Sequence, residues 1–320
     1  MRARYIDSPE VMRLKRYLAA MGWALGMLVL ILDGKTAMTG AAEGLAICIQ
    51  TLIPNLFPFF LLSSMLTSSL SGRALILTGI LGGYPVGAGN VAQAYRAGQL
   101  SKAEAERMAV LCNCAGPSFI FGVIVPVIGD LKAGFIIWGT YLLSIFALWI
   151  ILPKAKPIEG FSKPLKLQQA LWNSLRAMAG VCGWVILFRV LLSILDRWVL
   201  WLLPQWASVV LYGILELSNG CLALAGLDPA LAVILAAGFV AFGGVCVLLQ
   251  TASVTEGLSL SYYFPGKVFQ SAISMLAASF FFPGAVSPLL QAVLGILAAF
   301  IGFTFLKIEK RCGNRQQIIV

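Results

Sequence analysis

The sequence contains no histidine, and only 11% of its 320 residues are charged. Without imidazole, the chain lacks the commonest proton shuttle and a common metal ligand, and Ser-His and Cys-His catalytic pairs are excluded. Soluble domains carry about a quarter charged residues, so this chain has too little polar surface to cover a soluble core. We therefore expect neither a histidine-dependent enzyme nor a soluble domain.

Acidic residues are the scarcer of the two charged classes, 13 against 23 basic ones, which gives a net charge of +10. The basic residues do not follow one helical stripe with interleaved aromatics, so nucleic acid is not an expected partner. They cluster outside the apolar runs, at Arg2, Arg4, Arg13, Lys15 and Arg16, at Lys154, Lys156, Lys163 and Lys166, and at Lys307, Lys310, Arg311 and Arg315. This pattern predicts a cytoplasmic N-terminus and central loop, and it favours a cytoplasmic C-terminus.

Disulfides and metal sites find little support in the seven cysteines, which lie almost wholly in apolar stretches without loop spacing. Cys112 and Cys114 form a Cys-x-Cys pair, yet a closed zinc site needs four ligands and no second pair is spaced to supply them. We expect buried, unreactive thiols, and neither a metal nor a cofactor.

Long hydrophobic runs dominate what remains, since 60% of the residues are hydrophobic and the mean hydropathy is +0.91. Runs near the 20 residues that span a bilayer recur along the chain. The sequence predicts an all-α, polytopic membrane protein with the lipid bilayer as its surroundings. The first run, 17–32, has the basic flank of a cleavable signal peptide, but Asp33 and Lys35 follow it without a small-x-small cleavage site, so a retained helix is preferred.

Five segments follow from this pattern. They are a basic N-terminal segment with a first transmembrane helix (1–40), a first repeat with broken helices (41–153), a basic cytoplasmic loop (154–166), a second repeat with an extra segment (167–306) and a basic C-terminal tail (307–320). A Gly-Gly pair ends an apolar segment in each half, at residues 82 and 243. Because one helix precedes the first unit and a basic loop precedes the second, the two diverged repeats should be inverted.

Interruptions in the first half come at three places. Pro54 and Pro58 should kink the run 41–71, and the segment 74–81 is too short to span before the glycine-rich stretch 82–90. Ser101 and Glu104 form a capping box that starts a helix running to Cys112, where 113–117 supplies a stop signal.

The second half is interrupted in a similar way. The run 198–225 is broken at 216–220, and Asp228 and Pro229 provide an N-cap and a first-turn proline for a helix that ends at Phe242. Broken backbone at membrane depth is tolerated only against protein or a water-filled cavity, so these interruptions predict re-entrant segments that line a substrate path. Surface turns at the bilayer face are the alternative.

Candidate ligand groups lie at these breaks. Glu216 is expected to couple to protons or pair with a cation, the alternative being an interfacial cap, and Lys267 to meet a carboxylate or to snorkel to the interface. The N–H groups around Asn113 suit an anionic or polar ligand. The predicted substrate-binding residues are Gly82, Gly83, Tyr84, Pro85, Gly87, Asn90, Asn113, Gly116, Ser118, Glu216, Asn219, Gly243, Gly244, Gln250, Thr251 and Lys267.

At these positions the chain resembles the nucleoside-recognition (Gate) domain membrane proteins, and within them the YlbJ group of sporulation integral membrane proteins. The resemblance rests on 53–60, 82–88, 101–107, 112–119, 215–220 and 242–250, with Tyr263 and Lys267. It implies a two-repeat fold related to concentrative nucleoside transporters and a role in endospore formation, proposed as dipicolinate movement across the forespore membrane. The chain departs from the family at 112–115, which leaves the substrate open.

These features predict a secondary transporter of a small polar or anionic metabolite, coupled to protons or sodium, in a bacterial cytoplasmic or forespore membrane. A non-transporting assembly or gating factor is the second hypothesis, in which the breaks serve helix packing. An intramembrane enzyme is disfavoured because no paired carboxylates share a segment at catalytic spacing. A homo-oligomer is compatible with either of the first two.

Overall fold

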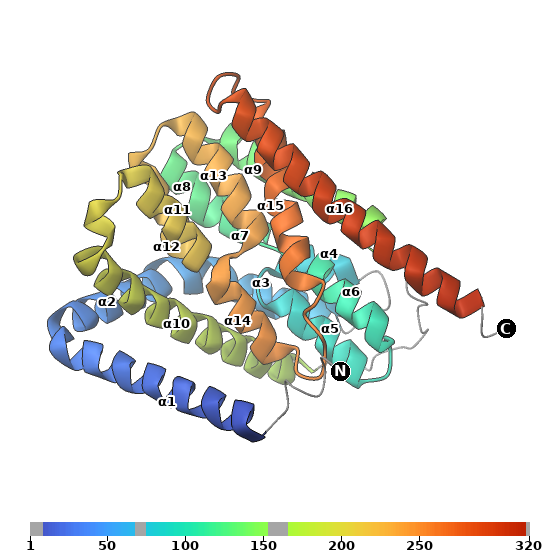
Figure 1. Cartoon of the computed structure of the whole chain (residues 1–320), viewed down its shortest axis with the longest axis horizontal. Coiled ribbons are helices and arrows are strands. Elements are labelled where there is room, and N and C mark those ends of the chain that lie inside the picture. Colours follow the sequence, from blue (N-terminus) through green and yellow to red (C-terminus); the bar gives the residue numbers. More distant parts are fainter. Residues whose placement is uncertain (1–8, 68–74, 153–165, 318–320) are drawn as a thin grey trace.

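The computed structural model describes residues 9–67, 75–152 and 166–317, and within these ranges the chain consists of helices and connecting turns, with no β-strand (Figure 1). The all-α prediction is therefore confirmed. Six helices in the described part of the chain are long and apolar enough to cross a bilayer, namely Gly34–Leu66, Lys102–Ile128, Leu131–Ile151, Leu167–Trp198, Pro229–Val254 and Pro288–Lys307. The chain is a polytopic integral membrane protein by these criteria.

Four kinds of element make up the first half after α1 (Pro9–Leu32). A long helix comes first, formed by α2 (Gly34–Ile47), a π-helical turn (Cys48–Leu52) and α3 (Ile53–Thr67). Hairpin one follows, formed by α4 (Leu75–Gly82) and α5 (Val86–Arg96). Broken helix one comprises α6 (Lys102–Cys112), break one at 113–116, α7 (Pro117–Phe119), a π-helical turn (Ile120–Ile124) and α8 (Val125–Ile128), and the unbroken α9 (Leu131–Ile151) ends the unit.

The second half contains the same kinds of element in the same order. The long helix is α10 (Leu167–Trp198), followed by a 3₁₀ turn (Leu200–Leu202). Hairpin two consists of α11 (Gln205–Leu215) and α12 (Leu217–Leu222), and a 3₁₀ turn (Ala223–Gly226) leads into broken helix two, which is α13 (Pro229–Phe242), break two at Gly243 and α14 (Gly244–Val254). The unbroken α15 (Tyr263–Ser279) closes the unit, and α16 (Pro288–Gln317) follows it.

Corresponding helices of the two units run antiparallel. Along α2 and α10, Thr36 bonds to Arg197 and Glu43 bonds to Arg189, so the numbers rise on one helix as they fall on the other. The same holds for α9 and α15, where Gly266 lies against Leu148 and the Ser274 hydroxyl donates to the Thr140 carbonyl. The hairpins accordingly lie on opposite sides of the molecule in Figure 1. Inverted repeats explain this arrangement.

The two Gly-Gly pairs occupy different positions in the two units, so the predicted correspondence between them was wrong. Gly82 and Gly83 lie at the tip of hairpin one, whereas Gly243 and Gly244 form the break within broken helix two. Gly243 and Gly244 have φ of 83° and 82°, the left-handed conformation that ends a helix at low cost with glycine. The tip of hairpin two carries Glu216 at the place where hairpin one has its glycine pair.

Local signals explain where several helices begin. The Ser101 hydroxyl accepts from the Glu104 amide at 3.2 Å and starts α6, as predicted. Asp228 accepts from Ala230 and Leu231 at 3.0 and 3.1 Å and, with Pro229 in the first turn, starts α13. These two caps and the break after Cys112 confirm the expected helix boundaries at those points.

Close packing of α2 on α10 holds the two units together. A Cβ on Gly40 would overlap Ser193, and one on Gly44 would overlap the backbone of Ile186. This spacing of small residues lets two backbones approach closely, the usual basis of helix association in lipid. Glycine is thus required at Gly40 and Gly44 by the close approach of α10.

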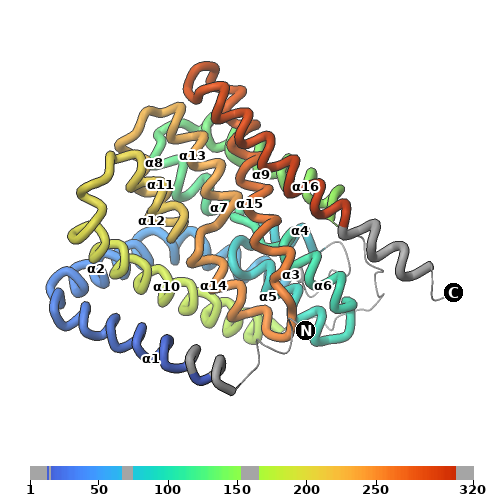
Figure 2. Tube along the Cα trace, viewed as in Figure 1, coloured from blue at the N-terminus to red at the C-terminus, as the bar shows by residue number. Residues whose placement is uncertain are grey.

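The peripheral helices are α1 and α16, which lie on opposite sides of the bundle in Figures 1 and 2. Both expose large apolar side chains, among them Trp23, Ile31, Phe300 and Phe303, as lipid-facing helices do. The described apolar part of α1, Arg16–Leu32, is shorter than the six spanning candidates. The expected boundary after residue 40 falls inside α2, and the one before residue 307 falls inside α16. Most of the predicted basic loop, including Lys154, Lys156 and Lys163, lies outside the described residues.

Candidate functional site

Both hairpin tips and both broken helices meet at one buried cavity of about 30 Å³, the central pocket. Hairpin one contributes Gly83 and Tyr84, break one Ala115 and Gly116, hairpin two Glu216 to Ser218, and α14 Val247 and Gln250. The apolar wall consists of Leu52, Leu56, Phe119, Val181, Val185 and Leu217. A cavity of this size holds only a water molecule or two, so the centre is closed in this conformation.

A much larger cavity of about 530 Å³, the vestibule, lies against the other side of hairpin one. Its walls come from α3, α5, α10, α14 and the residues after α14, and they include Phe60, Ser64, Pro85, Val86, Gly89, Asn90, Gln93, Arg96, Asn173, Ser174, Arg176, Ala177, Ser253, Val254 and Glu256. Pro85 and Val86 face the vestibule while Gly83 and Tyr84 face the central pocket. The tip of hairpin one therefore separates the two cavities.

Glu216 forms the tip of hairpin two and caps α12. Its carboxylate accepts from the Ser218 amide at 3.0 Å, from the Asn219 amide at 2.6 Å and from the Asn219 side-chain amide at 2.7 Å. The residue is 2% exposed and lines the central pocket. None of the salt bridges within the described ranges involves it. Glu216 therefore makes the contacts of a helix cap, which was the alternative interpretation of the sequence. It lies in the interior, however, and not at the membrane interface.

Backbone packing fixes the shape of each hairpin. Gly79 and Gly87 face each other across hairpin one, and a Cβ on either would overlap the carbonyl oxygen of Cys112 at the end of α6. In hairpin two, Gly213 and Gly220 face each other with equally little space. A glycine pair thus lets the two helices of each hairpin pack closely. Hairpin one in addition packs against the last turn of α6 before break one.

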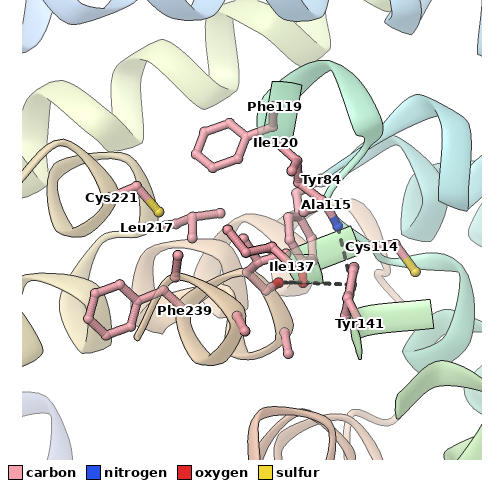
Figure 3. Close-up of a cluster of buried hydrophobic side chains, with 14 of the residues drawn as sticks. Tyr84, Cys114, Ala115, Phe119, Ile120, Ile137, Tyr141, Leu217, Cys221 and Phe239 are labelled. Carbon is pink, nitrogen blue, oxygen red and sulfur yellow. Dashed lines mark hydrogen bonds between the residues drawn. The ribbon is translucent and has the colours of Figure 1, made fainter. Parts of the chain in front are cut away.

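A chain of hydrogen bonds connects the two breaks. The Ala115 amide, freed at break one, donates to the Tyr141 hydroxyl at 3.2 Å, which lies 3.2 Å from the Tyr84 hydroxyl. Tyr84 in turn donates to the carbonyl of Val240 at 2.9 Å, in the last turn of α13. Since Tyr84 gives its proton to Val240, Tyr141 is the donor between the tyrosines. Figure 3 shows Tyr84, Ala115 and Tyr141 side by side.

Asn113 links break one to the second unit. Its side-chain amide donates to the Thr251 hydroxyl at 2.7 Å and to the Tyr263 hydroxyl at 2.6 Å. Its backbone carbonyl, freed by the break, accepts from the Lys267 ammonium at 2.6 Å. Unpaired backbone groups at bilayer depth cost several kcal/mol each, and Lys267 removes that cost for the Asn113 carbonyl.

The predicted site residues divide into four groups. Five line the central pocket: Gly83, Tyr84, Gly116, Glu216 and Gln250. Pro85 and Asn90 line the vestibule. Asn113, Ser118, Asn219, Thr251 and Lys267 are buried polar residues outside both linings, and Gly82, Gly87, Gly243 and Gly244 serve backbone packing or turns. Lys267 does not reach the interface, since it is fully buried.

Several residues of the site are absent from the prediction. Tyr141 lies in an unbroken apolar helix and has no local signal. Gln270 forms part of a polar stripe on α15 with Tyr263, the predicted Lys267 and Ser274, at the spacing of one helical face, and that periodicity was available in the sequence. The vestibule residues Arg96 and Arg176 come from segments distant in sequence, and only the fold brings them together.

No group of three or more histidine, cysteine, aspartate or glutamate side chains is close enough to hold a metal ion within the described residues. The six cysteines whose side chains are described are free thiols, and five of them are buried, namely Cys48, Cys112, Cys114, Cys221 and Cys246.

Comparison of the chain with family models, with curated proteins and with solved structures gives no match.

Proposed function

We propose that this chain is a secondary transporter of a small polar or anionic metabolite. One observation carries the proposal: the tips of two oppositely placed hairpins, break one and the half-helix α14 that follows break two converge on the central pocket. Discontinuous helices that meet near the midplane at the interface of inverted repeats are the usual construction of a secondary-transporter substrate site. Helix packing alone gives no reason to bring both hairpin tips, break one and α14 to one cavity that also contains a buried carboxylate, Glu216.

The two cavities suit alternating access. The vestibule, at about 530 Å³, lies within the range of roughly 300–1,000 Å³ that small-molecule sites occupy, whereas the central pocket is far smaller. A metabolite in the vestibule reaches the centre only if hairpin one moves. In this proposal hairpin one is the gate on the vestibule side, and hairpin two is its counterpart on the other side.

Charge in the vestibule favours an anionic or strongly polar cargo. Arg96 and Arg176 provide two guanidinium groups against the single carboxylate of Glu256, and Asn90, Gln93 and Asn173 add amides. Guanidinium forks bind carboxylates in a bidentate manner. Together with the Gate-domain and YlbJ-like resemblance, this charge makes nucleosides, dicarboxylates and dipicolinate the first candidates, and a bacterial cytoplasmic or forespore membrane the proposed location with the N-terminus cytoplasmic.

Glu216 is the proposed coupling group. A carboxylate at the tip of a hairpin, in contact with the central pocket, is placed to gain or lose a proton as the hairpin opens. Its hydrogen bonds to Ser218 and Asn219 stabilise the charged form while hairpin two is closed. This arrangement supports proton coupling through Glu216.

A two-stage experiment tests the proposal. The purified full chain is screened by thermal shift with uridine, adenosine, malate and dipicolinate, and hits are tested for uptake and counterflow in proteoliposomes. We expect at least one saturable hit, and a tenfold or greater loss of uptake in Arg176→Gln. Arg197→Gln, on the same helix with a side chain 62% exposed at the other end, is the matched control and should retain uptake. No hit from the panel, or equal uptake by both variants, would contradict the proposed site.

A further inference from the structure

Lys267 is a buried cation with no anion beside it among the described residues. Its side chain is 0% exposed, and the salt bridges formed by described residues do not include it. An ionised amine away from water is costly unless its surroundings replace the lost hydration. Groups of the protein must therefore replace the water molecules around the Lys267 ammonium.

Three neutral oxygens surround the ammonium. Nζ of Lys267 lies 2.6 Å from the backbone carbonyl oxygen of Asn113, 2.9 Å from Oε1 of Gln270 and 3.5 Å from the hydroxyl of Tyr84. They belong to a carbonyl, an amide and a phenol, and none carries a formal charge. An ammonium group has three N–H donors, so this set matches its capacity.

Aromatic rings complete the shell. Nζ lies 5.2 Å from the ring centre of Tyr84, 5.7 Å from that of Tyr263 and 6.0 Å from that of Tyr141. Ring faces attract cations within about 6 Å, and more strongly where water is excluded. The surroundings are thus those of a cation site built from uncharged groups.

The three oxygens around Lys267 also resemble the ligands of a free monovalent cation. Carbonyl oxygens that replace a hydration shell are how proteins bind bare monovalent cations at bilayer depth. The Asn113 carbonyl is available only because α6 ends there, and Oδ1 of the same residue has no hydrogen-bond partner among the described residues. Break one therefore presents a backbone oxygen to the position that Lys267 fills from the neighbouring helix α15.

We propose that Lys267 is the tethered occupant of a monovalent-cation site formed by break one, hairpin one and α15, and that removing its amine opens this site to a free monovalent cation such as sodium or methylammonium. Resting on the proposed function, the inference adds that the cation at break one is not exchanged during a transport cycle. Sodium is then not the coupling ion at this break, which leaves that role to the proton on Glu216.

The test is a cation-dependent melting experiment on the full chain in detergent. Tryptophan fluorescence follows unfolding of the wild type, Lys267→Ala and Lys267→Met in sodium, potassium or methylammonium chloride, each compared with choline chloride at equal ionic strength. In Lys267→Ala we expect a lower Tm and a saturable recovery in at least one of the three cations, by about 3 °C per tenfold concentration above Kd. The wild type and Lys267→Met, whose unbranched side chains fill the space, should match choline.

Three outcomes overturn the proposal. They are Lys267→Ala following choline in every cation, Lys267→Met recovering to the same extent, and a wild-type response equal to that of Lys267→Ala. Where Lys267→Ala is not recovered as folded protein, it is purified in methylammonium; recovery only with the cation supports the proposal, and failure in every cation overturns it. No uptake is measured, so failure of the metabolite screen and failure of this test are separate results.

Discussion

The hydroxyl of Tyr84 donates to the carbonyl oxygen of Val240 at 2.9 Å, which joins the tip of hairpin one to the last turn of α13. Val240 O is one of the carbonyls that lose their intrahelical partner because α13 ends at Phe242. A single side chain from the first unit thus satisfies a backbone group that the break in the second unit leaves open. The stability of one break depends on the position of the other unit's hairpin.

Replacement of Tyr84 by phenylalanine tests this dependence. Tyr84→Phe keeps the ring but leaves the Val240 carbonyl without its partner and the Tyr141 hydroxyl without its acceptor. We expect a loss of about 1–3 kcal/mol of stability, measured as a lower Tm in detergent. Tyr17→Phe, at a site 73% exposed, is the matched control and should melt as the wild type does. Equal melting of the two variants would contradict the hydrogen-bond chain.

Two glycines on α5 provide a second matched pair. A Cβ at Gly87 would overlap the Cys112 carbonyl, whereas a Cβ at Gly89 would meet only Val254 at an ordinary 4.0 Å. Gly87→Ala should therefore force hairpin one away from α6 and destabilise the protein by about 1–3 kcal/mol or more. Gly89→Ala should be neutral or gain up to about 1 kcal/mol, the usual difference between glycine and alanine in a helix. Thermal melting distinguishes them, and a reversed order would show that hairpin one packs differently.

Glu216 and Asp228 are both helix caps, yet only Glu216 lines the central pocket. Glu216→Gln retains one acceptor oxygen for the α12 amides, so we expect a folded protein with a Tm lowered by a few degrees and uptake of a confirmed substrate reduced at least tenfold. Asp228→Asn makes the equivalent change at the surface and should retain uptake. A proton-coupled wild type should also lose uptake when the pH gradient is collapsed, and Glu216→Gln exchange should not respond to it. Full uptake by Glu216→Gln would remove it from the mechanism.

Sidedness gives a fourth prediction. Asn173 lines the vestibule near the start of α10, and Thr36 of α2 bonds to Arg197 near the other end of α10. The helix between Asn173 and Arg197 is about 35 Å long, enough to span the hydrocarbon core. With single cysteines in a background lacking the accessible native thiols, an impermeant maleimide should label Asn173→Cys from the cytoplasmic face and Thr36→Cys from the opposite one. Labelling of both from one face would contradict a spanning α10, and the reverse pattern would invert the proposed orientation.

Local chemistry accounts for the part of this fold that was predictable. Asp228 with Pro229, and Ser101 with Glu104, are start signals that act within one helical turn, so their outcome did not depend on the rest of the chain. The stop after Cys112 is similarly local. The sequence likewise placed Glu216, Asn113 and Tyr84 at interruptions, and those residues do lie at the tips and breaks.

Long-range pairing accounts for the part that was not. The correspondence between the two glycine pairs failed because Gly83 turns a hairpin while Gly243 ends a helix, and both tasks favour the same residue. Tyr141 carries no signal because its partners, Ala115 and Tyr84, come from other segments. Arg96 and Arg176 line the same cavity only because α5 and α10 both contribute to the walls of the vestibule.

The hydrogen bonds that run from Ala115 through Tyr141 and Tyr84 to Val240 also restrict how hairpin one can move. If hairpin one withdraws, it strands a donor on α9 and an acceptor on α13 in the same step, and Lys267 loses one of its oxygens and the nearest of its rings. Each of these losses is tolerable only if water or a ligand enters as the tyrosine leaves. Opening of the gate and wetting of the centre are therefore one event, and an empty, dry, open centre is the state that this molecule is built to avoid.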